Sequence, residues 1–171
     1  MKQYVTLQVF KTFRKVRYYT FQIEGHKQNE TDKFFSKLEF VEVIADDLFR
    51  LNRLIITIGE RTGAIIDLFR PEDEAVALPP RPHFRLHKIL QVREIQHNSL
   101  RLYCIWISEE IVILANGGIK ESQKTEDSPD LMPHFRFVKS MGKQINKLIA
   151  ENSFTFEGKD TFDVEDIDLT F

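Results

Sequence analysis

The sequence of 171 residues contains a single cysteine, Cys104, and therefore cannot form an internal disulfide framework. No apolar run approaches the roughly 20 residues that a membrane-spanning helix needs. Residues 1–13 lack an unbroken apolar segment and a small-residue cleavage site, so we expect no signal peptide. These absences predict a cytoplasmic protein in a reducing compartment, with no association with a membrane.

Motifs that hold metals or nucleotides are missing as well. His26, His83 and His97 do not have metal-ligand spacing with one another or with Cys104. The glycine pair at 117–118 is a turn signal and not a nucleotide-binding loop. No hydrolase nucleophile motif occurs. The sequence therefore predicts neither a bound metal nor a cofactor.

The composition that is present describes one folded domain with a large core. Apolar residues make up 42% of the chain, and fifteen are phenylalanine. The net charge of −2 is distributed unevenly: residues 151–171 contain seven acidic residues and one lysine, a charge of −6, which leaves +4 on residues 1–150. A basic body can still present the local positive field that phosphate binding requires.

The spacing of apolar residues predicts an α+β fold, with a single domain over residues 1–171. β-Branched and aromatic residues alternating with polar ones indicate strands in residues 4–23. A helical hairpin is expected at 30–61, where Asn29 is suited to cap the first helix. A third helix is expected at 135–152.

Three antiparallel strands are predicted between the hairpin and the last helix, at 86–96, 100–108 and 111–116, with short connections that suit tight turns. Several prolines break up the region before them, so residues 64–82 are predicted to be a surface insertion with a helical turn at 67–69. Beyond residue 152, acidic and aromatic residues alternate. This pattern indicates a strand or an extended docking segment. It could fold back over a basic face, add an edge strand, or form a dimer contact.

Four short segments carry basic, aromatic or apolar residues at or just beyond the predicted strands. They are residues 91–93 (QVR), 101–103 (RLY), 111–115 (IVILA) and 120–125 (KESQKT). In this order and spacing, the chain resembles the core of the RelE/HigB-like toxin superfamily, including its phage-derived branch. Members share an E-x-R-like strand, an R-x-x-Y-like strand, an apolar strand and a K-K-x-x-K loop. The resemblance covers about residues 16–150, so that 1–15, 64–82 and 153–171 would be additions.

The resemblance implies a RelE-like fold: an N-terminal strand, a helical hairpin, a three-stranded antiparallel meander and a C-terminal helix, here followed by an extra acidic C-terminal segment. It also implies the toxin of a type II toxin–antitoxin system, a ribosome-dependent endoribonuclease that cleaves messenger RNA by metal-independent attack of a ribose 2′-OH on the adjacent phosphate. That reaction needs a base, an acid and cations around the developing charge. The implied partners are a small antitoxin protein, the ribosome and messenger RNA.

Particular side chains receive roles from the same resemblance. Arg93 would bind the scissile phosphate, since a guanidinium can contact two phosphate oxygens at once. Arg101 would stabilise the charge of the transition state. Tyr103, on the same side of its strand as Arg101, would stack on a base or transfer a proton. The other candidates for catalysis or RNA contact are Lys120, Lys124, Gln123, His87, Lys88 and Arg85.

Each of these side chains also has a structural interpretation. Arg93 would pair with Glu94 on the sheet surface, Tyr103 would pack in a half-buried position, and the lysines would lie on a solvated loop. Glu121 stands where the family has its second lysine, and a carboxylate there weakens contacts with an RNA backbone.

A second interpretation is that the chain has the same fold but no catalytic activity. The chain would be a catalytically inactive relative that binds protein or RNA. The missing lysine, the acidic segment, the insertion and a pI of about 6.2 favour this alternative. A nucleic-acid-binding regulator finds less support because no helix-turn-helix with a basic recognition helix is evident. A homodimer remains open in either case.

Overall fold

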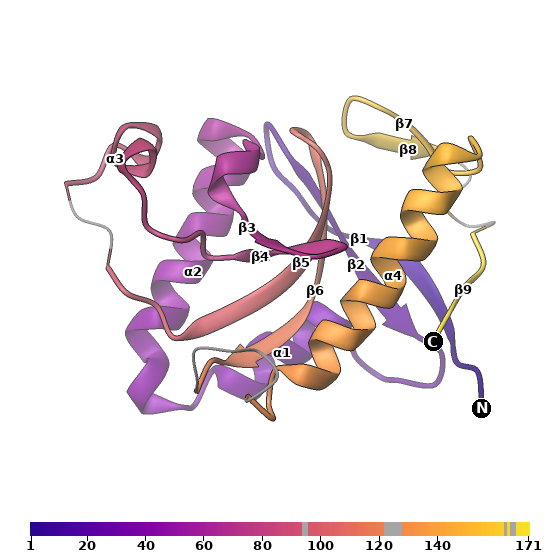
Figure 1. Cartoon of the computed structure of the whole chain (residues 1–171), viewed down its shortest axis with the longest axis horizontal. Helices are drawn as coiled ribbons and strands as arrows, with labels where there is room; N and C mark the ends of the chain where they lie inside the picture. The colour runs from indigo at the N-terminus through magenta and orange to yellow at the C-terminus, as the bar shows by residue number, and fades with distance from the viewer. Residues whose placement is uncertain (94–95, 122–127, 163, 165–166) are drawn as a thin grey trace.

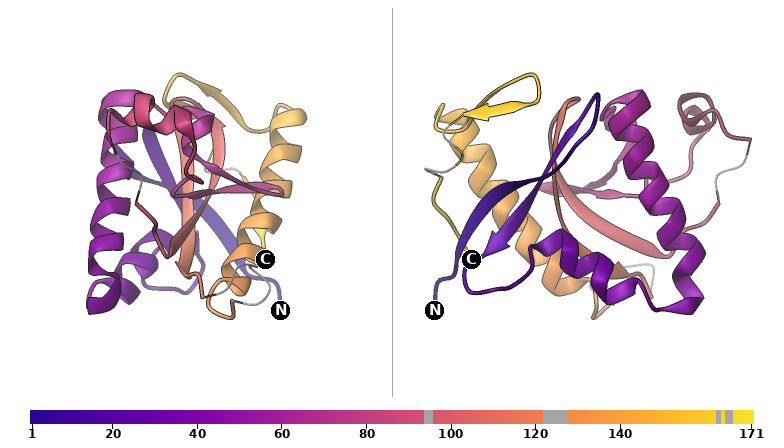
Figure 2. Two further views of the ribbon diagram at one scale, coloured as in Figure 1. Left: turned by 60° about the vertical axis from the view of Figure 1, so that its left-hand side comes forward. Right: turned by 180° about the vertical axis from the view of Figure 1, so that it is seen from behind.

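The computed structural model describes residues 1–93, 96–121, 128–162, 164 and 167–171. It has an α+β fold, which confirms the predicted class: a sheet lies between helix α4 on one face and helices α1, α2 and α3 on the other (Figure 1, Figure 2). The α-helices are α1 Glu30–Leu38, α2 Ala45–Thr57, α3 Phe84–Leu90 and α4 Met132–Ala150. Shorter helical turns are η1 Glu42–Ile44, η2 Ile58–Thr62 and η3 Ile66–Leu68.

Seven strands form the main sheet, in the order β3-β4-β5-β6-β2-β1-β9. All neighbours are antiparallel except β2 and β6, which are parallel. Two further strands, β7 and β8, form a separate hairpin. The strands are β1 Tyr4–Thr12, β2 Arg17–Ile23, β3 Arg70–Glu72, β4 Ala75–Leu78, β5 Leu100–Ser108, β6 Ile111–Ile119, β7 Thr155–Glu157, β8 Asp160–Phe162 and β9 Leu169–Thr170.

Helices α1, α2 and α4 are present as predicted, and the capping residue and apolar spacing seen in the sequence stabilise them. The side chain of Asn29 caps α1 by accepting a hydrogen bond from the backbone N–H of Asp32 at 2.8 Å. Helix α2 buries Leu51 and Ile55 on one face, and η2 continues it as a wider turn to Gly63. Helix α4 buries Val138, Met141 and Ile145 at helical spacing.

The strand predicted at 86–96 is wrong, because residues 84–90 form helix α3. Leu86 is buried beneath this helix, and Ile89 and Leu90 are half-buried three and four residues later. That spacing is helical, and Gln91 in the left-handed conformation ends the helix. The first strand of the predicted meander is therefore absent from its expected place.

The surface insertion predicted at 64–82 is also wrong, although its helical turn at 67–69 corresponds to η3. Strands β3 and β4 form a hairpin there, and β4 pairs with β5 through Val76↔Cys104 and Leu78↔Leu102. Ala75 and Ala77 face the core under α4, while Leu78 faces the opposite core. The alternation over four residues supplies the first strand of the β4–β5–β6 meander.

Strand β5 contributes to both halves of the hydrophobic core. Tyr103 and Ile105 pack in the cluster beneath α4, while Leu102 and Cys104 pack in the cluster beneath α1 and α2. A strand buried on both faces is central to a fold, because successive side chains point to opposite sides of the sheet. Figure 2 shows the sheet between α2 and α4.

The acidic C-terminal segment adds an edge strand, which is one of the expected alternatives. Strand β9 pairs with β1 through Tyr4↔Thr170 and Val5↔Leu169. Leu169 and Phe154 are almost completely buried in the cluster beneath α4. The segment is thus part of the core. Among the described helices, none combines the length and apolar character required to cross a bilayer.

Candidate nucleic-acid interface

Four cations and one carboxylate gather at one end of the β3–β4–β5–β6 meander. Arg70 and Glu72 lie on β3, and Arg81 follows β4. Arg101 lies near the start of β5, and Lys120 comes directly after β6. Pairing of Arg101 with Gly118, and the 2.7 Å hydrogen bond from Lys120 N–H to the carbonyl of Ser99, bring the last two together. We call these five residues the cationic cluster.

The electrostatics of the cationic cluster are unbalanced toward positive charge. Burial, and then the neighbouring charges of Arg101 and Arg81, lower the pKa of Arg70 to about 10. Burial and the charge of Arg101 likewise lower the pKa of Lys120. Arg70, Arg101 and Lys120 therefore lie in surroundings that disfavour their charged forms, and a bound anion would relieve that cost.

Glu72 is the carboxylate within the cationic cluster. Burial raises its pKa above the usual value, whereas the charges of Lys120, Arg70, Arg81 and Arg101 act in the opposite direction. The side chain is half-buried. A carboxyl group with a raised pKa beside several cations has the properties of a proton-transfer group.

Arg101 is the most deeply buried member of the cationic cluster, with 6% of its surface exposed. Its Nη1 donates to the carbonyl oxygens of Asn98 at 3.0 Å and Leu100 at 2.6 Å. Its Nε has no hydrogen-bond partner within the described part of the chain. These acceptors are neutral, and Glu72 is the carboxylate that acts on the charge of Arg101. Arg101 therefore adds positive potential to the cationic cluster from a buried position.

Tyr103 is fully buried, and its ring lies 5.8 Å from that of Phe135 on α4. The side chain belongs to the core beneath α4. The packing interpretation expected a half-buried position, and the burial is complete. Stacking on an RNA base would require displacement of Phe135.

The predicted site residues between 85 and 93 lie on α3 and the turn after it. They do not lie on or beside the strand that was predicted at 86–96. Arg85 forms an ion pair with Asp67 at 3.4 Å. His87 Nδ1 lies 3.3 Å from the carbonyl oxygen of Val92. Lys88 and Arg93 are exposed. Among the described residues, no hydrogen bond or ion pair joins this group to the cationic cluster. Gln123 and Lys124 lie outside the described residues, and so does Glu94, the pairing partner expected for Arg93.

The structure therefore unites only part of the predicted site. Arg101 and Lys120 come together, and Arg70 and Glu72 join them although the sequence interpretation did not include either. Both residues lie in the region interpreted as an insertion. The short apolar run Ala75–Leu78, bounded by acidic residues and prolines, is the signal that could have revealed the β3–β4 hairpin.

Comparison with known proteins finds no matching family model, no matching curated protein and no matching solved structure. In the described part of the chain, no group of three His, Cys, Asp or Glu side chains could hold a metal ion.

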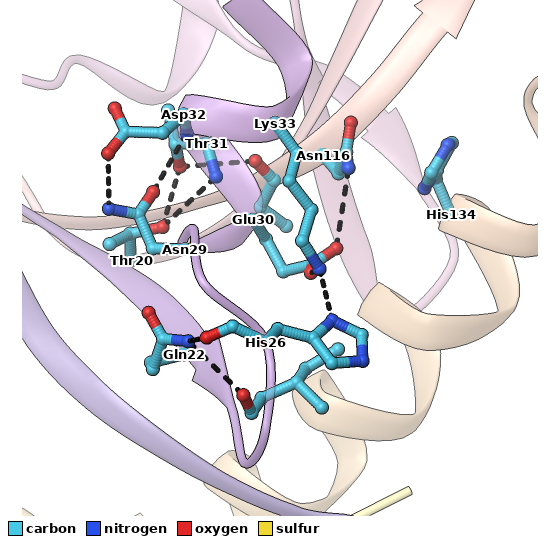
Figure 3. A network of polar contacts seen from close by, with 12 residues as sticks. Thr20, Gln22, His26, Asn29, Glu30, Thr31, Asp32, Lys33, Asn116 and His134 are labelled. Carbon is cyan, nitrogen blue, oxygen red and sulfur yellow. Dashed lines mark hydrogen bonds and ion pairs between the residues drawn. The ribbon is translucent and has the colours of Figure 1, made fainter. Parts of the chain in front are cut away.

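A second polar network anchors α1 to the sheet (Figure 3). The hydroxyls of Thr20 and Thr31 lie 2.7 Å apart, and Thr31 also donates to the carbonyl of Ala115 at 3.1 Å. Asn116 donates to the buried carboxylate of Glu30 at 3.3 Å. These bonds satisfy polar groups that would otherwise be costly to bury, so their role is structural.

His134 at the start of α4 lies beside this network, and we expect it to make stability depend on pH. Its Nε2 lies 3.4 Å from the Nζ of Lys37. Burial, and then the charge of Lys37, lower the pKa of His134 below 6.5. In the unfolded chain this pKa returns to about 6.5. The unfolded state therefore binds more protons as the pH falls below about 6.5, and stability decreases there.

Urea unfolding at about pH 7.5 and about pH 5.5 tests this expectation. The wild-type midpoint should fall at the lower pH, and the fall should be smaller for His134→Gln. Carboxylates that titrate in the same range affect both chains equally, so the difference isolates His134. Equal shifts in the two chains would show that His134 does not carry the effect.

Proposed function

We propose that this chain is a RelE/HigB-like toxin that binds messenger RNA on the ribosome and cleaves it by attack of a ribose 2′-OH on the adjacent phosphate. The observation that carries the proposal is the gathering of Arg101 and Lys120 with Arg70 and Arg81. Four cations against the single carboxylate of Glu72 suit a phosphodiester backbone. A small antitoxin protein is the proposed partner that keeps the activity in check.

The order of elements supports the finer assignment of a RelE-like topology. Two helices, α1 and α2, follow an N-terminal strand. A meander of β4, β5 and β6 comes next, and the C-terminal helix α4 follows it. In this assignment β1, β3, α3 and the segment after α4 are additions to the core.

The attack forms a bond from the 2′-oxygen to phosphorus and breaks the bond from phosphorus to the 5′-oxygen. It needs a proton acceptor, a proton for the departing 5′-oxygen, and stabilisation of negative charge. Lys120, whose pKa is lowered by burial, is the proposed donor of that proton. Glu72 is the proposed acceptor of the 2′-OH proton, since it is the carboxylate that faces the four cations. Lys120 and Arg81 are the members with accessible charge, half-buried and exposed respectively. They would contact phosphate oxygens, and Arg101 would stabilise the developing charge from below.

A binding module without catalysis is the second candidate, and the burial of two proposed catalytic residues favours it. Arg101 is 6% exposed and Tyr103 is 0% exposed, so neither side chain meets a ligand directly in this conformation. Such a protein would bind RNA through Lys120 and Arg81 and leave it intact.

Two substitutions separate binding from cleavage. Lys120→Gln removes a cation, so we expect RNA affinity to fall about tenfold and the salt dependence of binding to decrease by about one unit of slope. Glu72→Gln removes the proposed base and makes the cationic cluster more positive. RNA affinity should therefore be retained or increased while cleavage is lost.

Induced expression in a bacterial host and sequencing of RNA 5′ ends provide the measurement. The wild-type chain should arrest growth and cut messages, both single variants should restore growth, and Arg136→Gln on exposed α4 surface should behave as wild type. Normal growth with intact messages, together with RNA binding in vitro, would support the binding module. No salt-dependent RNA binding at all would rule out both candidates.

A further inference from the structure

A pocket of about 650 Å³ opens on the face of the sheet that α2 covers. Its walls come from α2, from the proline-containing segment 79–82 after β4, from α3, and from residues 96–98 before β5. Figure 1 shows α2, α3 and this segment on one side of the molecule. The volume lies within the range of about 300–1,000 Å³ that is typical of sites for small molecules.

Four arginines line this pocket, and no carboxylate does among the described residues that line it. Arg61 donates to the carbonyl oxygens of Ile89 at 3.3 Å and Leu90 at 3.1 Å, and Arg70 donates to that of Pro79 at 3.5 Å. These acceptors are neutral, and no ion pair within the described structure engages Arg61, whereas the carboxylate of Glu72 acts on the charge of Arg70. The pocket therefore attracts an anion.

The other two arginines differ in what they offer a ligand. Arg50 is paired with Asp47, and its buried Nε has no partner in the described structure. Arg53 is exposed and lies over the ring of Phe49, 5.9 Å from the ring centroid. No ion pair within the described structure engages Arg53. Arg53 is thus a cation whose charge is available at the mouth of the pocket.

The remaining walls suit a flat, partly apolar group. The ring of Phe49 lines the pocket and is 62% exposed, so it is accessible to a ligand. Leu54, Leu86 and Leu90 add apolar surface, and the amides of Gln91 and Gln96 offer both donors and acceptors. An aromatic ring together with amides is the combination that binds the face and the edge of a nucleobase.

We propose that this arginine pocket binds one nucleotide of an RNA strand, with a phosphate on Arg53 and Arg61 and the base against Phe49. Arg70 belongs both to the pocket and to the cationic cluster. An RNA strand that binds across the cluster can therefore enter the pocket while staying in contact with positively charged residues. The identification of the ligand as RNA rests on the proposed function. The cationic and aromatic character of the pocket does not depend on that function.

An acidic peptide is the other ligand that arginines would attract. Its carboxylates would engage the cations but leave Phe49 and the two glutamine amides without a matching group. A nucleotide uses both features, and for that reason we favour it.

Titration of the full-length chain with the four ribonucleoside 5′-monophosphates, and separately with inorganic phosphate, tests the proposal by NMR. At least one nucleotide should bind at α2 and α3. Arg53→Gln should weaken binding of both nucleotide and phosphate about tenfold. Phe49→Ala should weaken only the nucleotide, also by about tenfold, because stacking needs a base. The control Arg136→Gln, on α4, should change neither affinity.

Three results would overturn the inference. They are no nucleotide binding at α2 and α3, equal weakening of nucleotide and phosphate by Phe49→Ala, and tighter binding of a hexaglutamate peptide than of any nucleotide. RNA affinity separates this inference from the proposed function. If RNA binds through Lys120 and is insensitive to Arg53→Gln, the pocket inference alone fails. If nucleotides bind but RNA does not, the proposed function fails and the pocket stands as a mononucleotide site.

Discussion

Substitution of Gly117 by alanine is expected to destabilise the protein by more than about 3 kcal/mol. A Cβ on Gly117 would overlap the backbone carbonyl oxygen of Arg101 on the neighbouring strand. The pairing of Leu102 with Gly117 holds β5 and β6 at this close approach, and Lys37 donates to the Gly117 carbonyl at 2.7 Å. Because the overlapping atom belongs to the backbone, no side-chain rotation can relieve the clash. Urea unfolding of the purified variant measures the loss.

The neighbouring glycine provides a matched control. A Cβ on Gly118 would meet the carboxylate of Asp130, which is a side chain and can rotate away. Rotation would cost the 2.9 Å hydrogen bond from the backbone N–H of Ile119, about 1–3 kcal/mol. Gly118→Ala should therefore be less destabilising than Gly117→Ala. The reverse order would mean that the β5–β6 register is not as described.

Phe154→Ala is expected to cost about 3–5 kcal/mol, although the residue lies in the acidic C-terminal segment. Its ring is 2% exposed and packs in the cluster beneath α4 with Phe137, Ile167 and Leu169. Truncation removes the buried ring and leaves a cavity that the rigid surroundings fill only in part. The free energy of unfolding in urea is the quantity to compare.

Phe156 two residues later is the control, because it is 37% exposed on the β7–β8 hairpin. Its replacement by alanine should cost about 1 kcal/mol or less. If both variants were equally mild, the segment would not contribute to the core. A large loss for Phe154→Ala alone would establish that the acidic segment stabilises the fold, as β9 and its pairing with β1 indicate.

The helices could be predicted from the sequence because their signals are local. The cap at Asn29, the spacing of buried residues along α2, and the apolar stripe of α4 each lie within one element. The β5–β6 hairpin could be predicted for the same reason, since its two strands are close in sequence. The end of β6 was wrong, because the glycine pair at 117–118 is not a turn but continues the strand to Ile119 and pairs with β5. That hairpin is also what brings Arg101 near Lys120.

The sequence did not reveal strand β4 or helix α3, because each is short and its type depends on distant partners. Four residues, Ala75–Leu78, carry a weak signal until β5 is available to pair with them. The seven residues of α3 contain too few turns to distinguish a helical period from an alternating one. The first strand of the meander is β4 and not residues 86–96. For that reason Arg85, His87, Lys88 and Arg93 lie on α3 or the turn after it, and not in the meander.

By itself, therefore, the sequence determined the α+β class, the three longer helices, and the closeness of Arg101 and Lys120. Only the tertiary structure decided that Arg70, Glu72 and Arg81 complete the cationic cluster and that Tyr103 is buried. The physical reason is the distance along the chain between the residues that interact. Helices and hairpins are specified by neighbours in the chain, whereas charge clustering and burial depend on pairing between strands that the sequence keeps about 25 residues apart, whose register local patterns leave open.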